Sequence, residues 1–577
     1  MTIKTIFRRA KVDDAHLPQD LHPIIRQVYA SRGMSDPADA DLTLKGLLPP
    51  NTMKGLQQAA LILYQAILNQ DKIIIIGDFD ADGATSTALM MEALSLFGSF
   101  NHDFLVPNRF EFGYGLSPEI VEVASKQGAN VIVTVDSGIS CHQGVERANE
   151  LGIDVVITDH HLPGAHLPEA AAIVNPNQLD CSFASKSIAG VGVAFYLALA
   201  LRALLREKNW FSEQGFDEPN LAQLLDIVAL GTVADVVALD KNNRILVAQG
   251  IERIRRGLTR PGIQALINVA KRNQFNLVAS DFGFALGPRI NAAGRLDDMT
   301  FGIRCLLAKS DQQAKEMAQE LDLLNKARRE IEQSMQHQAE MILQQLNDSS
   351  KHNATAIALY QRDWHQGVIG IVAGRLKEKL HRPCIVFAQD ENGQDIKGSA
   401  RSIPGLHIRD LLENISSQHP GLIKKFGGHA MAAGLTIAET DFEQFEKLFD
   451  LFAIEALDEK DLQGVVLSDG ELPVEAYSIE FASLLRESGP WGQKFEEPVF
   501  DDVFTIVQQR IVGEKHLKLV LAKEDVALDA IAFNVDLDIW PNATATQVHV
   551  AFKLDINEFR GKQNVQLMVE QLSLDNL

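Results

Sequence analysis

The stretch KIIIIGDFDADGATST, residues 72–87, indicates the fold class, and the rest of the chain is organised around it. Its four consecutive isoleucines, residues 73–76, predict a central strand buried on both faces, as in a parallel sheet. Directly after this strand, three carboxylates stand on alternate residues: Asp78, Asp80 and Asp82. Carboxylates this close raise one another's pKa unless a cation lies among them. The stretch therefore predicts one or two divalent metal ions at the carboxyl end of a sheet strand.

The same aspartates also match the start of an EF-hand calcium loop, which takes oxygen ligands from alternate positions. That loop needs a glutamate at its twelfth position, which is Leu89 here, and a helix where this chain has its isoleucines. The calcium-loop interpretation fails on both counts. A solvated acidic turn stays open at this point, although it does not explain the acidic residues that follow later strands.

Length and composition are those of a multidomain globular protein: 577 residues, 46% hydrophobic and 23% charged. Its four cysteines are scattered without a C-x-x-C pair, which indicates a reducing compartment and no zinc knuckle. The N-terminus lacks the apolar core of a signal peptide, and the longest apolar run, residues 188–201, is too short to span a bilayer. We therefore expect a cytoplasmic protein without a membrane segment.

The net charge of −22 argues against whole-surface affinity for nucleic acid but leaves room for a local basic groove. The densest basic stretch is IERIRRGLTR, residues 251–260. It could line a channel for a nucleic-acid strand, or it could be a solvated helix face. Charge alone therefore does not decide the substrate.

Strands and helices alternate after residue 72. Strands are expected at residues 73–76, 102–106, 130–135 and 153–158, with helices of about a dozen residues between them. This alternation predicts a doubly wound parallel α/β sheet. Ligands of such sheets bind beyond the carboxyl ends of the strands.

Further candidate ligands follow the later strands. Asp136 stands in VDSGIS after the third strand, and Asp159, His160 and His161 follow the fourth. Asp235 stands in LGTVADVVAL, past an apparent Gly-Thr break in an apolar helix. Each residue alone could be a helix cap or an ordinary loop side chain. Together, carboxylate oxygens and an imidazole nitrogen suit Mn²⁺, with Mg²⁺ a weaker fit for histidine.

The motifs GDFDADGATST, VDSGIS, TDHH and GTVAD together resemble the DHH phosphoesterase superfamily, and the resemblance covers nearly the whole chain. Within the superfamily, the chain is similar to the bacterial exonucleases specific for single-stranded DNA. The resemblance implies a doubly wound DHH domain, a long connecting helix, a second α/β domain of the DHH-associated kind and a C-terminal OB-like β-barrel. We expect an N-terminal helical segment at residues 1–70, followed by these four at residues 71–305, 306–350, 351–457 and 458–577.

The resemblance also implies two divalent ions, Mn²⁺ or Mg²⁺, held by Asp80, Asp82, Asp136, His160 and Asp235, with Asp78 either a further ligand or a partner of one. Asp136 would bridge the two ions and so belongs with the catalytic residues. His161 would contact the scissile phosphate, and Asp159 would orient a histidine.

Substrate contacts are expected in two further places. LGPRINAAGRLDD is either a phosphate-binding segment or a tight turn with surface arginines, and GSARS and FGGHAMAAG lie in the second α/β domain. Gly-Gly-His alone would more often be a turn. With the resemblance, the expected substrate contacts are Arg109, Arg289, Asn291, Arg295, Ser399, Arg401, Gly427, Gly428 and His429.

The implied activity is two-metal hydrolysis of single-stranded DNA from a 5′ end to mononucleotides, in DNA repair and recombination. Expected partners are a single-strand-binding protein and a DNA helicase, and the chain is expected to be a monomer. Two alternatives stay open. One is a DHH phosphodiesterase acting on short oligoribonucleotides, cyclic dinucleotides or pyrophosphate, and the other is a catalytically silent replication scaffold. The long connecting helix and the barrel favour a polymer substrate.

Overall fold

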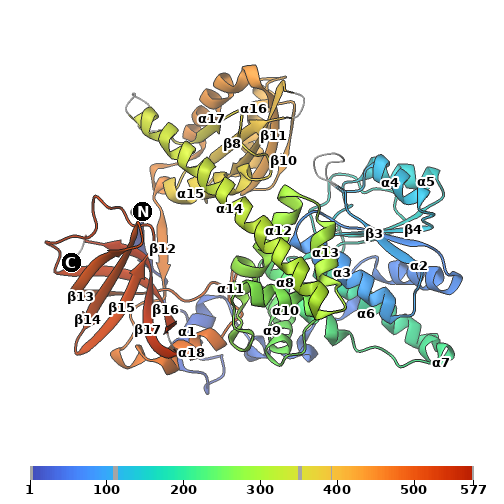
Figure 1. Cartoon of the computed structure of the whole chain (residues 1–577), viewed down its shortest axis with the longest axis horizontal. Helices are drawn as coiled ribbons and strands as arrows, with labels where there is room; N and C mark the ends of the chain where they lie inside the picture. The colour runs from blue at the N-terminus through green and yellow to red at the C-terminus, as the bar shows by residue number, and fades with distance from the viewer. Residues whose placement is uncertain (1–3, 108–114, 348–353, 391–392, 560, 575–577) are drawn as a thin grey trace. The chain divides into compact units, whose positions relative to one another are not determined.

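The computed structural model describes residues 4–107, 115–347, 354–390, 393–559 and 561–574 (Figure 1). The chain divides into two compact units. The first unit holds residues 12–326 and 487–497, and the second unit holds residues 1–11, 327–486 and 498–577. Among the described residues, no helix is both long and apolar enough to cross a bilayer.

The first unit is built on a five-stranded, all-parallel sheet in the order β3-β2-β4-β5-β6. Its strands are β2 (Ile73–Ile76), β3 (His102–Leu105), β4 (Val131–Val135), β5 (Asp154–Thr158) and β6 (Ala172–Val174). The first four agree with the prediction, and β6 was not predicted. The strand order reverses between β2 and β4, which is where ligands bind in doubly wound folds. The predicted fold of this domain is confirmed.

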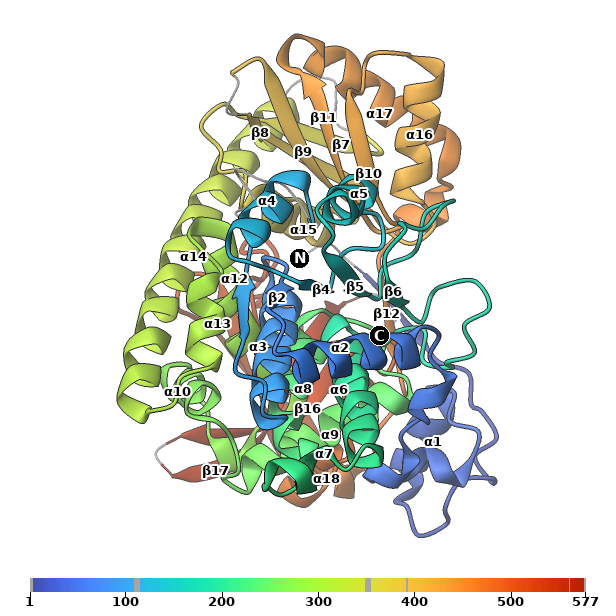
Figure 2. The ribbon, with the colours of Figure 1, turned by 90° about the vertical axis from the view of Figure 1, so that its right-hand side faces the viewer.

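Helices cover both faces of this sheet (Figure 2). One face packs against α4 (Pro118–Lys126) and α5 (His142–Glu150), and the other lies against α3 (Ala81–Leu96) and α6 (Gly190–Glu207). The side chains of β2 are fully buried, as a strand covered on both sides requires. Ser117 caps α4 through its side chain, and Pro118 occupies the first turn, as the sequence predicts.

The remaining α-helices of the first unit surround this core. They are α1 (Pro23–Ser31), α2 (Leu56–Asn69), α7 (Trp210–Gln214), α8 (Leu225–Ala234), α9 (Lys241–Arg255), α10 (Pro261–Val269), α11 (Ala279–Asp281), α12 (Gly287–Leu296) and α13 (Thr300–Leu306). A π-helix, Phe282–Leu286, precedes α12. The predicted connecting helix is α14 (Asp311–Asn347), which begins in the first unit and ends in the second.

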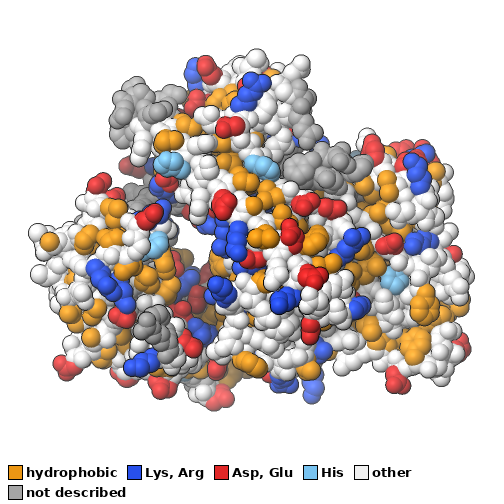
Figure 3. All heavy atoms as spheres, in the orientation of Figure 1, with side chains coloured by type: hydrophobic (Ala, Val, Ile, Leu, Met, Phe, Trp, Pro, Cys, Tyr) orange, Lys and Arg blue, Asp and Glu red, His pale blue; other side chains and the backbone are white. Residues whose placement is uncertain are grey.

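The basic stretch at residues 251–260 is largely used inside the first unit. Arg260 forms a buried ion pair with Asp226 at 2.8 Å, and Arg255 donates to the carbonyl of Leu277. On the face shown in Figure 3, acidic and basic side chains are interspersed. Arg255 and Arg260 therefore already have protein partners, and the channel interpretation of this stretch stays a prediction for its other two arginines.

The second unit contains a five-stranded mixed sheet in the order β10-β11-β9-β8-β7, in which only β7 and β8 pair in parallel. Its strands are β7 (Ile357–Tyr360), β8 (Cys384–Gln389), β9 (Asp395–Arg401), β10 (Lys425–Gly428) and β11 (Ala432–Ala438). Helix α15 (Ile369–Leu380) packs on one face. Helices α16 (Ile408–Gln418) and α17 (Phe442–Ala456) pack on the other. This is the second α/β domain expected from the sequence.

A closed five-stranded barrel forms the C-terminal end of the second unit, as predicted. It is preceded by α18 (Ile479–Glu487), and its strands are β13 (Phe500–Val512), β14 (His516–Lys523), β15 (Val526–Ala532), β16 (Gln547–Phe559) and β17 (Lys562–Ser573). The N-terminal segment, expected to be helical, also contains a strand: β1 (Thr5–Arg8) pairs in parallel with β12 (Val465–Ser468). The expected segment boundaries remain a prediction.

The N-terminal strand is tied to the barrel by a buried carboxylate. Asp501 accepts hydrogen bonds from Arg8 at 2.8–3.0 Å and from Ser468, and His549 Nε2 lies 2.8 Å away. Burial alone would raise the pKa of Asp501, but these partners hold it below its usual value. We expect Arg8→Leu to lower the free energy of unfolding of the second unit by roughly 2 kcal/mol, because a buried charge loses its main partner. Urea unfolding measures this effect. The exposed Arg510→Leu variant is the control, and equal stability of the two variants would contradict the prediction.

Candidate metal centre

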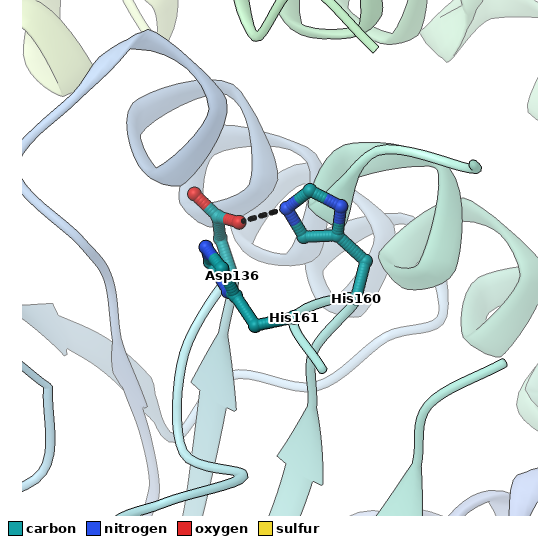
Figure 4. Close-up of side chains that lie close together, drawn as sticks. All are labelled: Asp136, His160 and His161. Atoms are coloured by element: carbon teal, nitrogen blue, oxygen red, sulfur yellow. Dashed lines mark ion pairs between the residues drawn. The ribbon is translucent and has the colours of Figure 1, made fainter. Parts of the chain in front are cut away.

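The predicted ligands converge at the carboxyl end of the sheet. Asp136 follows β4 and His160 follows β5, and His160 Nε2 lies 3.1 Å from Asp136 Oδ1 (Figure 4). The same nitrogen lies 3.5 Å from Asp235 Oδ2 and 4.0 Å from Asp82 Oδ2. Side chains from four segments that are distant in sequence therefore meet around one imidazole.

Among the described residues, three groups of side chains bring their donor atoms within 4.8 Å of one another. They are Asp78–Asp80–Asp136, Asp82–His160–Asp235 and Asp136–His160–His161. The first two groups share no residue, and the third contains both Asp136 and His160. Carboxylate oxygens with one imidazole nitrogen suit Mn²⁺ well and Mg²⁺ less well. The donor set thus fits two divalent ions, with Asp136 next to both positions.

The electrostatics of these aspartates also favour a cation. Burial, and secondarily repulsion from neighbouring carboxylates, raises the pKa of Asp82 to about 7. The same two causes raise the pKa of Asp136 and Asp235 well above the ordinary value. Without a cation, the fold therefore disfavours the charged form of these groups. A divalent ion among them reverses that preference.

The N-terminus of α6 holds Asp82 in place. The backbone N–H groups of Gly190 and Val191 donate to its two carboxylate oxygens at 2.6 and 2.9 Å. A Cβ at Gly190 would lie 2.6 Å from Asp136 Oδ1, so only glycine lets this helix start approach both aspartates. Sequence reasoning missed Gly190. The signal that could have found it is the G-x-G at residues 190–192, where an apolar helix begins.

Asp159 orients His161, as the resemblance implied. Its Oδ1 accepts from His161 Nδ1 at 2.7 Å and from the backbone N–H groups of His160 and His161, and its Oδ2 accepts from Ile139 N at 2.9 Å. Burial alone would lower the pKa of His161, but the hydrogen bond and charge of Asp159 raise it to about 8. The contact with Asp159 therefore fixes the orientation of the ring through Nδ1 and favours its protonated form near neutral pH.

The expected Gly-Thr break before Asp235 is absent: α8 runs through Gly231 and Thr232 and ends at Ala234. A Cβ at Gly231 would lie 2.1 Å from Thr85 Oγ1 and 3.1 Å from Asp82 Oδ1. This glycine therefore serves close packing of α8 against α3 and does not end the helix. Asp235 caps the helix, and Val236 turns the chain with a φ of +62°.

The segment LGPRINAAGRLDD ends the π-helix and forms α12, so it is a helix and not a turn. Arg289 is buried and donates to Asp322 and to the carbonyl of Ala285. The Oδ1 of Asn291 accepts from the backbone N–H of Ala81 at 2.8 Å. Arg295 lies in the last turn of α12 and is partly exposed. Arg109 lies outside the described residues.

The substrate residues expected in the second unit lie on neighbouring strands. Ser399 on β9 pairs with Gly434 on β11, which in turn pairs with Gly427 on β10. Arg401 donates to the Ser399 hydroxyl at 3.1 Å and to a backbone carbonyl, and burial lowers the pKa of its guanidinium. Gly428 has a φ of +146°, and a Cβ there would meet β11, so glycine is required. His429 follows directly, with its N–H bonded to Ala432.

Comparison with known proteins gives three family matches along the chain. Residues 72–232 match the N-terminal domain of the DHH family, residues 353–455 match the DHHA1 domain, and residues 468–571 match the RecJ OB domain. The chain is 54% identical to the single-stranded-DNA-specific exonuclease RecJ of Dickeya dadantii, over 99% of this chain and 100% of that protein. The chain belongs to the RecJ family. The Escherichia coli RecJ is 54% identical over 98% of both chains.

Solved RecJ structures share the fold. RecJ of Thermus thermophilus in complex with Mn²⁺ matches with a TM-score of 0.78 and 28% identity, over 97% of this chain and 77% of that chain. The Mg²⁺ complex of the same RecJ matches with a TM-score of 0.72 and 27% identity, over 97% and 76% of the two chains. The predicted fold class and the predicted family are both confirmed.

Proposed function

We propose that this chain is a metal-dependent exonuclease that hydrolyses single-stranded DNA in the 5′→3′ direction to 5′-mononucleotides. The observation that carries the proposal is the convergence of buried aspartates and His160 at the switch point of the parallel sheet. The names of the RecJ relatives, single-stranded-DNA-specific exonucleases, support the substrate.

The metal ligands in this proposal are Asp78, Asp80, Asp82, Asp136, His160 and Asp235. Bound divalent ions supply an activated water and neutralise charge on the phosphate. Asp136 belongs to the first donor group and lies 3.1 Å from His160 of the second, so it would hold both ions. His161, held by Asp159, donates a hydrogen bond to the scissile phosphate. Asp159 serves catalysis by holding that imidazole.

Contacts to the 5′ end are assigned to the second unit. Ser399, Arg401 and His429 offer donors to phosphate, and Gly427 and Gly428 leave backbone accessible to the strand. Arg295 and Arg109 remain candidates for phosphate contact. Arg289 is a further candidate, and its guanidinium also donates to Asp322 and to the carbonyl of Ala285.

The cellular setting follows from the activity. A nuclease that takes single strands needs duplex to be opened, so a helicase and a single-strand-binding protein are its proposed partners, in cytoplasmic DNA repair and recombination. The chain acts as a monomer in this proposal. The family match of residues 468–571 to an OB domain favours a polymer over a cyclic dinucleotide or a short oligoribonucleotide.

Degradation of end-labelled DNA tests the proposal. With Mn²⁺ or Mg²⁺, a single strand labelled at its 5′ end should release labelled mononucleotide at once, whereas a 3′ label should be released last. A blunt hairpin and EDTA-treated reactions should show no degradation. Faster cleavage of a short oligoribonucleotide or cyclic dinucleotide would favour the alternative enzyme, and inactivity on every substrate would favour the scaffold.

Metal removal should make stability depend on pH. Asp82 has a folded pKa of about 7, above its unfolded value near 4, so the folded state binds more protons between these pH values. Without metal, the free energy of unfolding should therefore fall as pH rises from about 4 to 7, by up to roughly 4 kcal/mol. Mn²⁺ should raise the free energy of unfolding again, and the increase should be larger at pH 8 than at pH 5. Thermal melts in EDTA and in Mn²⁺ measure this, with Asp82→Asn as the variant whose slope shrinks. An equal metal effect at both pH values would contradict the prediction.

A further inference from the structure

We propose that Asn291 is a positioning residue for the metal centre, acting on the ligand loop at residues 78–82. This inference rests on the proposed function, and it differs from the DNA contact that the sequence suggested for Asn291. The structure places the side chain of Asn291 against the backbone of that loop.

The key contact lies between two proposed ligands. Ala81 is the first residue of α3, and its N–H has no partner within the helix. Asn291 Oδ1 accepts this N–H at 2.8 Å, across 210 residues of sequence. Because Asp80 and Asp82 flank Ala81, a shift of this peptide moves both carboxylates.

A second residue of α12 packs closely against the same loop. A Cβ at Gly294 would lie 1.9 Å from the carbonyl oxygen of Phe79. Asn291 and Gly294 are three residues apart, so they lie on the same face of the helix. Helix α12 thus lies directly against the ligand loop. The hydrogen bond from Ala81 N–H to Asn291 fixes the position of the loop along this helix.

The helix that carries Asn291 is itself anchored. Arg289 Nη2 lies 2.8 Å from Asp322 of α14, and Arg289 Nη1 donates to Ala285 O at 2.6 Å. Both side chains of this ion pair are largely buried. Asn291 therefore has a rigid base, as a residue that orients ligands requires.

Mn²⁺ binding to the full-length chain, measured by titration calorimetry, tests the inference. Asn291→Leu, which keeps the size but removes the acceptor, should weaken Mn²⁺ binding by roughly 10-fold or more. Asn291→Asp keeps an oxygen acceptor and should bind no more weakly than wild type. Asn268→Leu, at an exposed position on α10, is the matched control and should bind as wild type. At saturating Mn²⁺, the KM for DNA should be unchanged in Asn291→Leu.

Wild-type Mn²⁺ affinity in Asn291→Leu, or a raised KM for DNA as its only defect, would overturn the inference. Asp136→Asn separates this failure from failure of the proposed function. If Asp136→Asn loses Mn²⁺ while Asn291→Leu keeps it, only the positioning role fails, whereas unchanged binding in both refutes the metal centre itself. Should Asn291→Leu melt below the assay temperature, Asn291→Ala gives the same test, because it also removes the acceptor and has a smaller apolar side chain.

Discussion

Asp136→Asn is expected to slow hydrolysis of single-stranded DNA by roughly 10³-fold or more. The substitution keeps the size of the side chain but removes a charge that belongs to the first donor group and lies 3.1 Å from His160 of the second. Metal ions in such sites supply several kcal/mol of transition-state stabilisation, and each 1.4 kcal/mol is about tenfold in rate. Single-turnover degradation of a labelled strand, at a fixed Mn²⁺ concentration, measures the loss.

Asp154→Asn is the matched control for this substitution. Asp154 begins β5 at the opposite end of the sheet and is exposed, so its charge should not matter to catalysis. Activity of Asp136→Asn within a few-fold of Asp154→Asn would show that Asp136 is not a bridging ligand.

Gly190→Ala is expected to reduce the same activity by roughly 10²-fold, although Gly190 is not expected to touch DNA. At an ordinary helical position this change stabilises a helix by up to about 1 kcal/mol. At Gly190, the new methyl would lie 2.6 Å from Asp136 Oδ1, and it would push α6 away from the carboxylate of Asp82. Displacing catalytic groups by about 1 Å lowers a reaction rate by roughly 10²-fold. Rate and Mn²⁺ affinity should fall together.

Gly374→Ala in α15 provides the comparison, because a Cβ there meets nothing within 4 Å. It should leave both the rate and Mn²⁺ affinity unchanged. Full activity in Gly190→Ala would mean that the start of α6 does not determine the geometry of the two aspartates.

The convergence of the proposed ligands was predictable because strand ends carry local signals. Asp78 and Asp136 each follow a run of buried apolar residues, and parallel strands bring their carboxyl ends to one edge. His160 follows β5 by the same rule. The sequence pattern, together with the family resemblance, was therefore enough to bring these side chains together before any distance was known.

Glycines that serve close packing were not predictable in this way. Gly231 was interpreted as a helix break, whereas it lies inside α8 because Thr85 and Asp82 leave no room for a Cβ. Gly190 lies in the longest apolar run of the sequence, residues 188–201, and its contact with Asp82 spans 108 residues. A local pattern does not show which partner a glycine must accommodate.

The partners of basic residues were not visible in the sequence. Arg260 and Arg289 each form an ion pair with an aspartate more than 30 residues away. Charge density along a chain does not reveal whether a guanidinium faces a substrate or a protein carboxylate. The pairing depends on how α8, α10, α12 and α14 pack, which only the tertiary structure shows.

Anomalous scattering from crystals soaked in Mn²⁺ tests the central claim most directly. Two manganese peaks are expected, one among Asp78, Asp80 and Asp136 and the other among Asp82, His160 and Asp235. Mn²⁺ bound elsewhere on the chain, with neither of these groups in contact with an ion, would contradict the claim.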